Sequence, residues 1–387
     1  MIIRELAQSS LLAAIRNDLD AGQVLQTAIA VQQIPAPTFA EDRRAVFVQR
    51  QFEQYGLQNL MLDALSNVYG CWPGQDATLP ALMVSAHIDT VFAVDVDLSI
   101  RREDDRLYGP GLGDNSLGVA GLLALLDIFQ KYRIVPRCDI WFVANSREEG
   151  LGNLDGIRAV WQALGARLGA AIVIEGMALG RIYHAGIAVR RLHITCHSPG
   201  GHSWLNFGQP SAVHGLIELG ARIIGLTPPI NPRTTFNIGL INGGHSVNSL
   251  ATSADLYLDL RSEAPDSLHQ LEQEILSTID IVRRPGVDFV IEVVGDRPAG
   301  RISVDHPLTQ LAADALDIVN IAPIYESGST DANLLLANGL PAVTVGISHG
   351  GHAHRLDEFI ETAPITDGIW QLLLLILAAS EQMSSLS

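Results

Sequence analysis

Side chains that can bind a metal ion follow four apolar stretches of this 387-residue sequence. They are His87, the adjacent Glu148 and Glu149, Glu175, and a tract with His349, His352 and His354. All of them are carboxylates or imidazoles, and no thiolate is among them. Such a set suits a divalent ion, zinc first and then cobalt or manganese.

The stretch Ala81–Ala86 has no charge and almost no polarity, which is typical of a strand buried on both faces of a parallel sheet. Side chains alternate along a strand, so His87 and Asp89 are expected to point the same way. A carboxylate beside a histidine can fix its tautomer and raise its basicity as a ligand. The alternative is a partly solvated His and Asp at a strand end.

Three further stretches predict buried strands: Asp139–Asn145, Ala170–Ile174 and Ala342–Ile347. In an open α/β sheet, sites form outside the carboxyl ends of the strands, where the ligand-type residues arrive. An adjacent pair such as Glu148 and Glu149 is, in isolation, usually a solvated acidic pair. The agreement among four strand ends is what favours a metal site.

A glycine-rich loop, Leu107–Ser116, leads into an apolar helix. Gly111 and Gly113 fit the start of a dinucleotide-binding GxGxxG motif, but its third position is Ser116 and no acidic residue ends a suitable following strand. The loop therefore argues against a dinucleotide site. Asp114, just before the helix, either caps that helix or joins the ligands.

The composition indicates a globular protein with two domains, because 387 residues exceed one ordinary core and 48% of them are hydrophobic. Lys and Arg total 25 against 42 Asp and Glu, a formal net charge of −17. This balance argues against nucleic-acid and anionic-membrane partners, which need a basic face, and is compatible with bound cations.

Three distant cysteines, Cys71, Cys138 and Cys196, make no disulfide framework and no CxxC pair, which predicts a reducing, cytoplasmic location. Charged residues among the first twenty interrupt any signal-peptide core. The apolar tail Ile369–Ala379 is too short to span a bilayer, so we expect a closing helix packed on the core. Residues 1–33 show helical spacing throughout and predict a helical segment ended by Ile34–Pro37.

The pattern changes between residues 186 and 300. The expected elements there are Ile187–Cys196 (strand), Pro210–Leu226 (helix), Thr234–Ile241 and Ala254–Arg261 (strands), Pro265–Val282 (helix) and Val287–Val294 (strand). This β-α-β-β-α-β order is that of a split ferredoxin-like unit. It predicts an inserted domain, 186–300, within a domain made of 1–185 and 301–387.

Five motifs together resemble the co-catalytic di-zinc peptidase and deacylase family that includes tripeptidase T, glutamate carboxypeptidase, aminoacylase and acetylornithine deacetylase. They are His87–Thr90, the glycine-rich Tyr108–Asn115, Glu148–Gly150, Glu175–Gly176 and Ala353–Ile360. One such motif is weak, whereas five in the right order across nearly the whole chain are highly specific. The resemblance implies an α/β fold: a mixed, mostly parallel sheet between helices, with an inserted ferredoxin-like dimerisation domain.

The resemblance also implies roles. His87 and Glu175 would hold one metal ion, Glu149 and His354 the other, and Asp114 would bridge the two, with a cis peptide bond to Asn115. Asp89 would orient His87, and Glu148 would be the general base. Spacing to Glu358 favours His354 among the three histidines, although a glycine-rich tract with three histidines is also typical of local ion binding.

The implied substrate-binding residues are His202, Asn248, Arg261 and Ser329. His202 matches the histidine that stabilises the oxyanion, supplied in dimeric members by the partner chain; the alternative is a loop histidine that caps a turn. The segment around Asn248 departs from the family's NxIP form, and Arg261 could instead form a surface ion pair. Ser329 lies in a loop resembling the one over the substrate carboxylate.

The sequence thus predicts a homodimeric, zinc-dependent hydrolase that cleaves an amide bond of a short peptide with water activated by two metal ions. The alternative is a deacylase of an N-acyl amino acid, of the acetylornithine or succinyl-diaminopimelate type, since only the pocket would differ. A non-catalytic metal-binding scaffold is a third possibility. It is disfavoured because neither a ligand nor Glu148 is missing.

Overall fold

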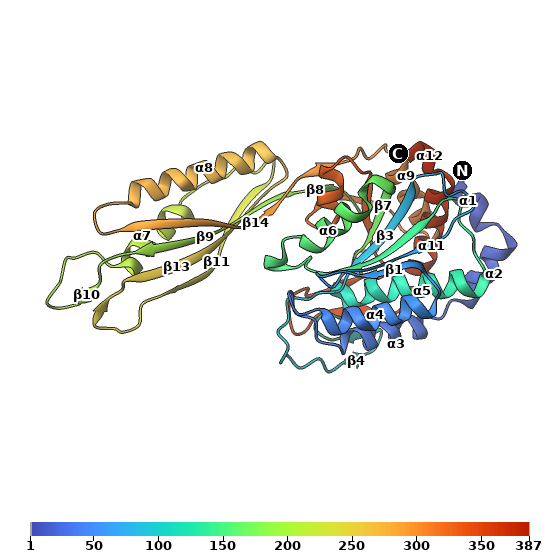
Figure 1. The fold of residues 1–387 in the computed structure, drawn as a ribbon, viewed down its shortest axis with the longest axis horizontal. Helices are drawn as coiled ribbons and strands as arrows, with labels where there is room; N and C mark the ends of the chain where they lie inside the picture. The colour runs from blue at the N-terminus through green and yellow to red at the C-terminus, as the bar shows by residue number, and fades with distance from the viewer. Residues whose placement is uncertain (1, 387) are drawn as a thin grey trace. The chain divides into compact units, whose positions relative to one another are not determined.

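The computed structural model describes residues 2–386, which form two compact units (Figure 1). The first unit comprises Met1–Gly186 and Gly300–Ser387, and the second comprises Ile187–Ala299. The chain therefore leaves the first unit after its first 186 residues, completes the second, and returns.

The first unit is built on a nine-stranded mixed sheet of order β1-β2-β6-β3-β7-β17-β8-β15, with β16 also paired to β8. The strands are β1 (Gln58–Leu62), β2 (Val68–Trp72), β3 (Ala81–His87), β6 (Ile140–Asn145), β7 (Leu168–Ile174), β8 (Arg181–Gly186), β15 (Gly300–Arg301), β16 (Ile324–Gly328) and β17 (Ala342–Val345). The central strands β6, β3, β7 and β17 run parallel, so their carboxyl ends share one edge. The predicted α/β class is confirmed.

Helices cover both faces of this sheet (Figure 1). One face packs against α1 (Ile2–Ala7), α2 (Ser10–Asp18), α3 (Ala21–Gln32), α4 (Asp42–Gln54), α5 (Leu117–Tyr132), α9 (Pro307–Ile318), α11 (Ile365–Glu381) and α12 (Met383–Leu386), and the other against α6 (Asp155–Leu164) and α10 (Ala332–Ala337). Alternate strand residues serve the two cores: Val84 joins the first and Met83 the second. The expected closing helix is α11, and it is almost wholly buried.

The segment 1–33 is helical, as predicted, and is divided into three helices. The hydroxyl of Ser9 accepts the N–H of Leu12 at 3.2 Å, and the carboxylate of Asp20 accepts the N–H of Gly22 at 2.8 Å. Each of these caps begins a new helix, a local signal that the apolar spacing alone does not contain.

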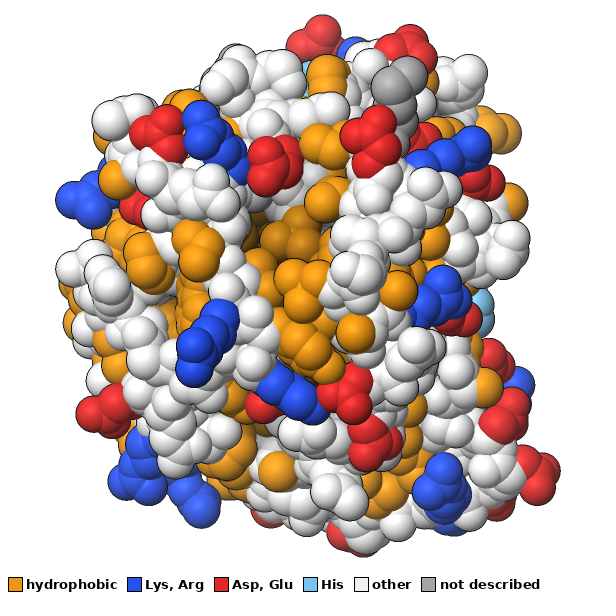
Figure 2. All heavy atoms as spheres, turned by 90° about the vertical axis from the view of Figure 1, so that its right-hand side faces the viewer, with side chains coloured by type: hydrophobic (Ala, Val, Ile, Leu, Met, Phe, Trp, Pro, Cys, Tyr) orange, Lys and Arg blue, Asp and Glu red, His pale blue; other side chains and the backbone are white. Residues whose placement is uncertain are grey.

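Among residues 2–386, only the segment Leu112–Tyr132 is long and apolar enough to cross a membrane, and it is mostly buried inside the protein. It consists of α5 and the irregular turn Leu112–Ser116 before it. Acidic and basic side chains are interspersed on the face of the molecule seen in Figure 2, around a hollow lined by hydrophobic groups. This face presents no continuous basic patch.

A small sheet links the glycine-rich loop to the histidine tract. Its order is β18-β19-β5-β4, with β4 (Arg101–Glu103), β5 (Arg106–Tyr108), β18 (Gly350–Gly351) and β19 (Phe359–Glu361). β5 leads into the loop and pairs with β19, which follows the tract. Two segments far apart in sequence are thereby fixed side by side. Single 3-10 turns also occur at Gly150–Gly152 and Gly165–Arg167.

The second unit has the predicted β-α-β-β-α-β order. Its elements are β9 (Ala188–His197), α7 (Ala212–Ile224), β11 (Thr234–Gly243), β13 (Ser253–Ser262), α8 (Pro265–Val282) and β14 (Asp288–Arg297). The strands form an antiparallel sheet of order β11-β13-β9-β14, and both helices pack their apolar residues on one face of it. The short strands β10 (Gly201–His202) and β12 (Ser249–Leu250) pair beyond one end of this sheet (Figure 1).

Candidate metal centre

His87 ends β3 and is almost completely buried. Its Nδ1 faces Asp89, 3.2 Å from the backbone oxygen and 3.4 Å from Oδ1. Its Nε2 lies 3.1 Å from Oδ1 of Asp114 and 3.6 Å from Oε2 of Glu175. Because Nδ1 faces acceptors, the neutral ring keeps its proton there, which leaves Nε2 as the nitrogen that can bind a cation shared with the other two carboxylates. Without a cation, a proton on Nε2 can instead be donated to Asp114.

Asp114 lies in the turn before α5, and its peptide bond to Asn115 is cis, as the resemblance implied. Gly111 has the left-handed φ of 69° that a glycine adopts freely. The carboxylate of Glu358 accepts the N–H groups of Gly113 at 2.7 Å and of Asp114 at 3.0 Å. Asp114 does not cap α5, whose capping position is Ser116, so its carboxylate is directed to other partners.

The two oxygens of the Asp114 carboxylate face two different histidines. Oδ1 lies 3.1 Å from Nε2 of His87, and Oδ2 lies 3.2 Å from Nε2 of His354. The same nitrogen of His354 lies 3.1 Å from Oε1 of Glu149. Ligand atoms of His87, Asp114 and Glu149 all lie within 4.8 Å of one another, close enough to hold an ion.

The other histidines of the tract have different surroundings. Nδ1 of His352 pairs with the carboxylate of Asp357 at 2.9 Å, and His349 makes a backbone bridge to Ala178. His354 is therefore the histidine of the tract that the structure brings to Asp114.

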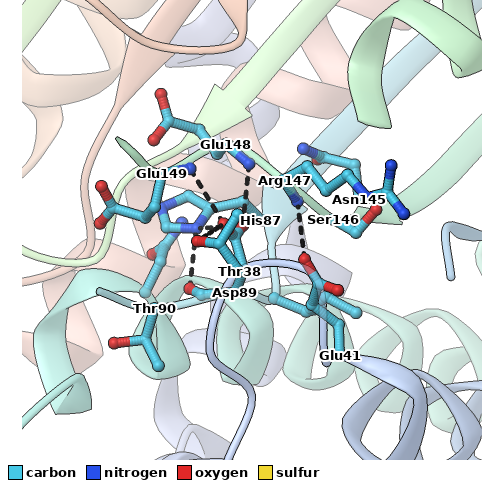
Figure 3. Close-up of polar contacts among 12 residues, drawn as sticks. Thr38, Glu41, His87, Asp89, Thr90, Asn145, Ser146, Arg147, Glu148 and Glu149 are labelled. Atoms are coloured by element: carbon cyan, nitrogen blue, oxygen red, sulfur yellow. Dashed lines mark hydrogen bonds and ion pairs between the residues drawn. The ribbon is translucent and has the colours of Figure 1, made fainter. Parts of the chain in front are cut away.

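Glu148 and Glu149 follow β6 and are both buried, at 6% exposure. Their side chains point in different directions (Figure 3). Oε1 of Glu149 lies beside Nε2 of His354, whereas the carboxylate of Glu148 is directed away from that contact. Their backbone N–H groups both donate to Asp89, to Oδ1 and Oδ2 respectively, each at 2.9 Å. Asp89 thus contacts the imidazole of His87 and the backbone of the paired glutamates at once.

A comparison with the sequence patterns of known protein families matches residues 83–378 to the family described as peptidase family M20/M25/M40. That range includes every residue of the cluster around Asp114. The chain belongs to this family.

Individual relatives are more distant. A putative succinyl-diaminopimelate desuccinylase of Mycobacterium tuberculosis is 26% identical over 300 residues, which cover 74% of this chain and 80% of that protein. A tripeptidase from Staphylococcus aureus has a TM-score of 0.78 at 19% identity, covering 94% of this chain and 100% of that one. A Bacillus subtilis protein described as a dinuclear metal-binding peptidase of the M20 family has a TM-score of 0.66 at 14% identity, covering 93% and 98%. These structures share the fold, and members of the M20 family act on peptides or on N-acylated amino acids.

The carboxylates of Asp114, Glu149 and Glu175 lie close together, and this proximity and their burial shift their pKa values. Burial, and then the charge of Asp114, raises the pKa of Glu149 to about 8; burial raises the pKa of Glu175 to about 7. Burial alone would raise the pKa of Asp114, but hydrogen bonds with His354 and His87 hold it below its ordinary value. Hydrogen bonds to Asp114 and then Glu149 raise the pKa of His354 to about 10. One buried and two partly buried carboxylates with two imidazoles form an environment that a cation would stabilise.

Of the residues expected to bind substrate, three lie in the second unit. His202 is exposed and pairs with Ser249 across β10 and β12, and the N–H of Ser203 donates to the carbonyl of Asn248 at 3.0 Å. Arg261 is on β13, where its Nε donates to Asp259 at 2.7 Å, the surface ion pair that was the alternative reading. Ser329 lies in the first unit, between β16 and α10.

The structure does not bring His202 and Arg261 together. β10 and β12 adjoin the start of β13, near Ser253, whereas Arg261 lies near its other end. The separation of eight residues from Ser253 to Arg261 corresponds to roughly 26 Å of extended strand. One short substrate therefore cannot contact both residues of the same unit.

Several residues outside the predicted set of site residues shape the site. The amide of Asn115 donates to the carbonyl of Ile174 at 2.8 Å and accepts the N–H of Gly176 at 2.9 Å, which fixes both neighbours of Glu175. The amide of Asn145 donates to Asp331 at 2.7 Å. Burial, and then the charge of Glu148, raises the pKa of this buried Asp331 well above its ordinary value. The strand-end rule could have found Asn145, which is aligned with His87.

Proposed function

We propose that this chain is a di-metal hydrolase that cleaves the amide bond of a short peptide. The observation that carries the proposal is the carboxylate of Asp114, whose two oxygens face Nε2 of His87 and Nε2 of His354. A carboxylate placed between two imidazoles in this way suits a bridging ligand between two ions.

The donor set fits two divalent ions. His87 and Glu175 would hold one of them, Glu149 and His354 the other, and Asp114 would contribute one oxygen to each. Nitrogen and oxygen donors without sulfur suit zinc, and also cobalt or manganese. When bound, such a pair of ions polarises the scissile carbonyl and lowers the pKa of water.

The protein's own residues then handle the protons. Glu148, adjacent to the ligand Glu149 but with its side chain directed differently, takes the proton of the attacking water and returns it to the leaving amine (Figure 3). Asp89 holds the backbone of Glu148 at 2.9 Å and faces Nδ1 of His87, so it positions base and ligand together. A histidine N–H, supplied by His202, stabilises the developing oxyanion.

Substrate carboxylate recognition is assigned to Ser329, Asn248 and Arg261. The separation of His202 from Arg261 along β13 supports a homodimer in which His202 serves the site of the partner chain. In that arrangement, each site uses residues from two copies of the inserted unit. The pairing of copies through this unit also covers the edge strand β11, which is exposed at Leu240 and Ile241.

The second candidate activity is deacylation of an N-acyl amino acid, which the similarity to the mycobacterial desuccinylase favours. The chemistry is the same, and the acyl pocket differs. A hydrolysis screen of the metal-loaded protein with di- and tripeptides, N-acetyl and N-succinyl amino acids distinguishes the two by the amine released. If the wild-type protein hydrolyses none of these compounds faster than the Glu148→Gln protein does, both candidates are contradicted.

A further inference from the structure

Four consecutive backbone N–H groups after β6 each donate to a side-chain oxygen from elsewhere in the first unit. Ser146 donates to Oδ1 of Asn67 at 2.9 Å and Arg147 to Oε1 of Glu41 at 3.2 Å. Glu148 and Glu149 donate to the two oxygens of Asp89. The segment 146–149, which carries the paired glutamates, belongs to no strand. Each of its backbone N–H groups is instead bound by a side chain (Figure 3).

Glu41, like Asn67, is an acceptor of this series that no motif indicated. It lies just before α4 and is buried, at 2% exposure. Its Oε1 accepts two N–H groups, from Phe39 at 3.0 Å and from Arg147 at 3.2 Å. Its carboxylate makes no capping hydrogen bond to α4, so its position at the helix start does not account for its burial.

The segment around Glu41 also contacts Asp89. The hydroxyl of Thr38 donates to Oδ2 of Asp89 at 2.9 Å, the same oxygen that accepts the N–H of Glu149. The guanidinium of Arg147 stacks over the ring of Phe39, 5.2 Å from its centroid. Residues 38–41 and 147–149 thus form one connected network around the carboxylate of Asp89.

We propose that Glu41 is a positioning residue that sets the direction of the Glu148 and Glu149 side chains by fixing the peptide N–H of Arg147. Arg147 has a φ of 56°, in the left-handed region that a non-glycine residue adopts only when its surroundings require it. A hydrogen bond from an N–H to a carboxylate is about twice as strong as one between neutral groups. Without it, the peptide between Ser146 and Arg147 can rotate, and the carboxylates of Glu148 and Glu149 move with it.

The inference rests on the proposed function for its kinetic readout, but its geometric content can be measured without turnover. Glu41→Gln keeps the oxygen that accepts both N–H groups, whereas Glu41→Met removes the acceptor at similar size. Glu53→Met, at an exposed position of α4, is the matched control for replacing a glutamate on this helix. Each variant is loaded with Co²⁺, and the visible spectrum, thermal unfolding, kcat and KM are measured.

We expect Glu41→Met to change the cobalt spectrum and to lower kcat or metal affinity by about 10–100-fold, the usual effect of losing a residue that orients ligands. KM should change little. Glu41→Gln should restore the spectrum and most of kcat, and Glu53→Met should match the wild type. If Glu41→Met does not fold, Glu41→Asp can replace it, because aspartate keeps the charge but shortens the side chain. Glu41→Asp is then expected to lower kcat or metal affinity with little change in KM.

Two results would overturn the proposal. One is a Glu41→Met protein that unfolds at lower temperature yet keeps the wild-type spectrum and kcat, which indicates a purely structural residue. The other is a Glu41→Gln protein as impaired as Glu41→Met. If the wild-type protein hydrolyses nothing, the proposed function fails, while the cobalt spectra of the variants still decide whether Glu41 positions Glu149.

Discussion

The backbone N–H of Trp204 donates to Nδ1 of His202 at 3.2 Å. Because Nδ1 accepts this bond, the proton of the neutral ring is on Nε2. The N–H of His202 in turn donates to Oδ1 of Asn206 at 2.8 Å, so the loop fixes both the backbone and the ring. His202 is exposed and preset as an Nε2–H donor, the form that stabilisation of an oxyanion requires.

His202→Ala is therefore expected to lower kcat by about 10²-fold, the effect of removing one such donor, without loss of bound metal. His202→Gln, whose amide can donate, should recover part of the loss. Steady-state kinetics and metal analysis on the same samples check this. Equal kcat for wild type and His202→Ala would mean that the ring only caps its turn.

Asp114→Ala should reduce the metal content of the loaded protein from two ions per chain to at most one. The reason is that one oxygen of Asp114 lies beside His87 and the other beside His354. Asp127→Ala, on the helix α5 that follows the turn of Asp114 and away from the cluster, is the matched control. Metal analysis after dialysis gives the stoichiometry. Two retained ions in Asp114→Ala would contradict the bridging role.

Glu148→Gln should keep both metal ions and lose about 10²–10⁴-fold in kcat, the usual contribution of a general base. Glutamine has nearly the shape of glutamate but does not accept the proton. The measurement is kcat at matched metal content. A variant with near wild-type kcat would show that the base is another residue.

The stability of the metal-free protein is expected to fall as pH rises. Folding raises the pKa of Glu149 from 4.5 to about 8, that of Glu175 from 4.5 to about 7, and that of His354 from 6.5 to about 10. Each group then binds protons more tightly when folded, so stability is lost as pH rises from the lower to the higher value. Asp114 has the opposite sign, but its effect is confined to acidic pH below 3.8.

Thermal unfolding in chelator between about pH 6 and pH 9 tests this sign, because each of the three windows covers part of that range. Tm should decrease across the range, and a saturating divalent ion should flatten the trend by replacing the protons. Glu149→Gln should show a shallower slope than the wild type. A Tm that rises with pH in chelator would contradict the assignment.

Much of this site could be predicted because its ligands follow uninterrupted apolar strands. His87 is the last residue of its strand, Glu149 comes four residues after a strand end and Glu175 one residue after a strand end. Parallel strands bring such ends to one edge. Asp114 could not be distinguished from a helix cap by sequence pattern alone. The choice of His354 depended on spacing within a motif, and the structure agrees because β19 fixes the tract beside the glycine-rich loop.

Glu41 and Asn67 could not be predicted in the same way. Both accept backbone N–H groups, and every residue type donates such a group, so no complementary side chain in the sequence indicates the partner. The contacts span 106 residues for Glu41 and 79 for Asn67. The breaks between α1, α2 and α3 were missed for a related reason: single capping side chains decide them, within a region of continuous helical spacing.

We expect the His202 that serves each site to come from the partner chain. If it comes from the partner chain, a mixture of His202→Ala and excess Glu148→Gln protein forms mixed dimers in which one site has both an intact Glu148 and a donated His202. Activity should then reappear, although each variant alone is impaired, provided that subunits exchange. A mixture of His202→Ala with the double variant His202→Ala/Glu148→Gln is the matched control and should stay impaired. Sedimentation at the working concentration establishes whether a dimer is present. Monomeric behaviour, with no recovery on mixing, would mean that His202 acts within its own chain or only caps its loop.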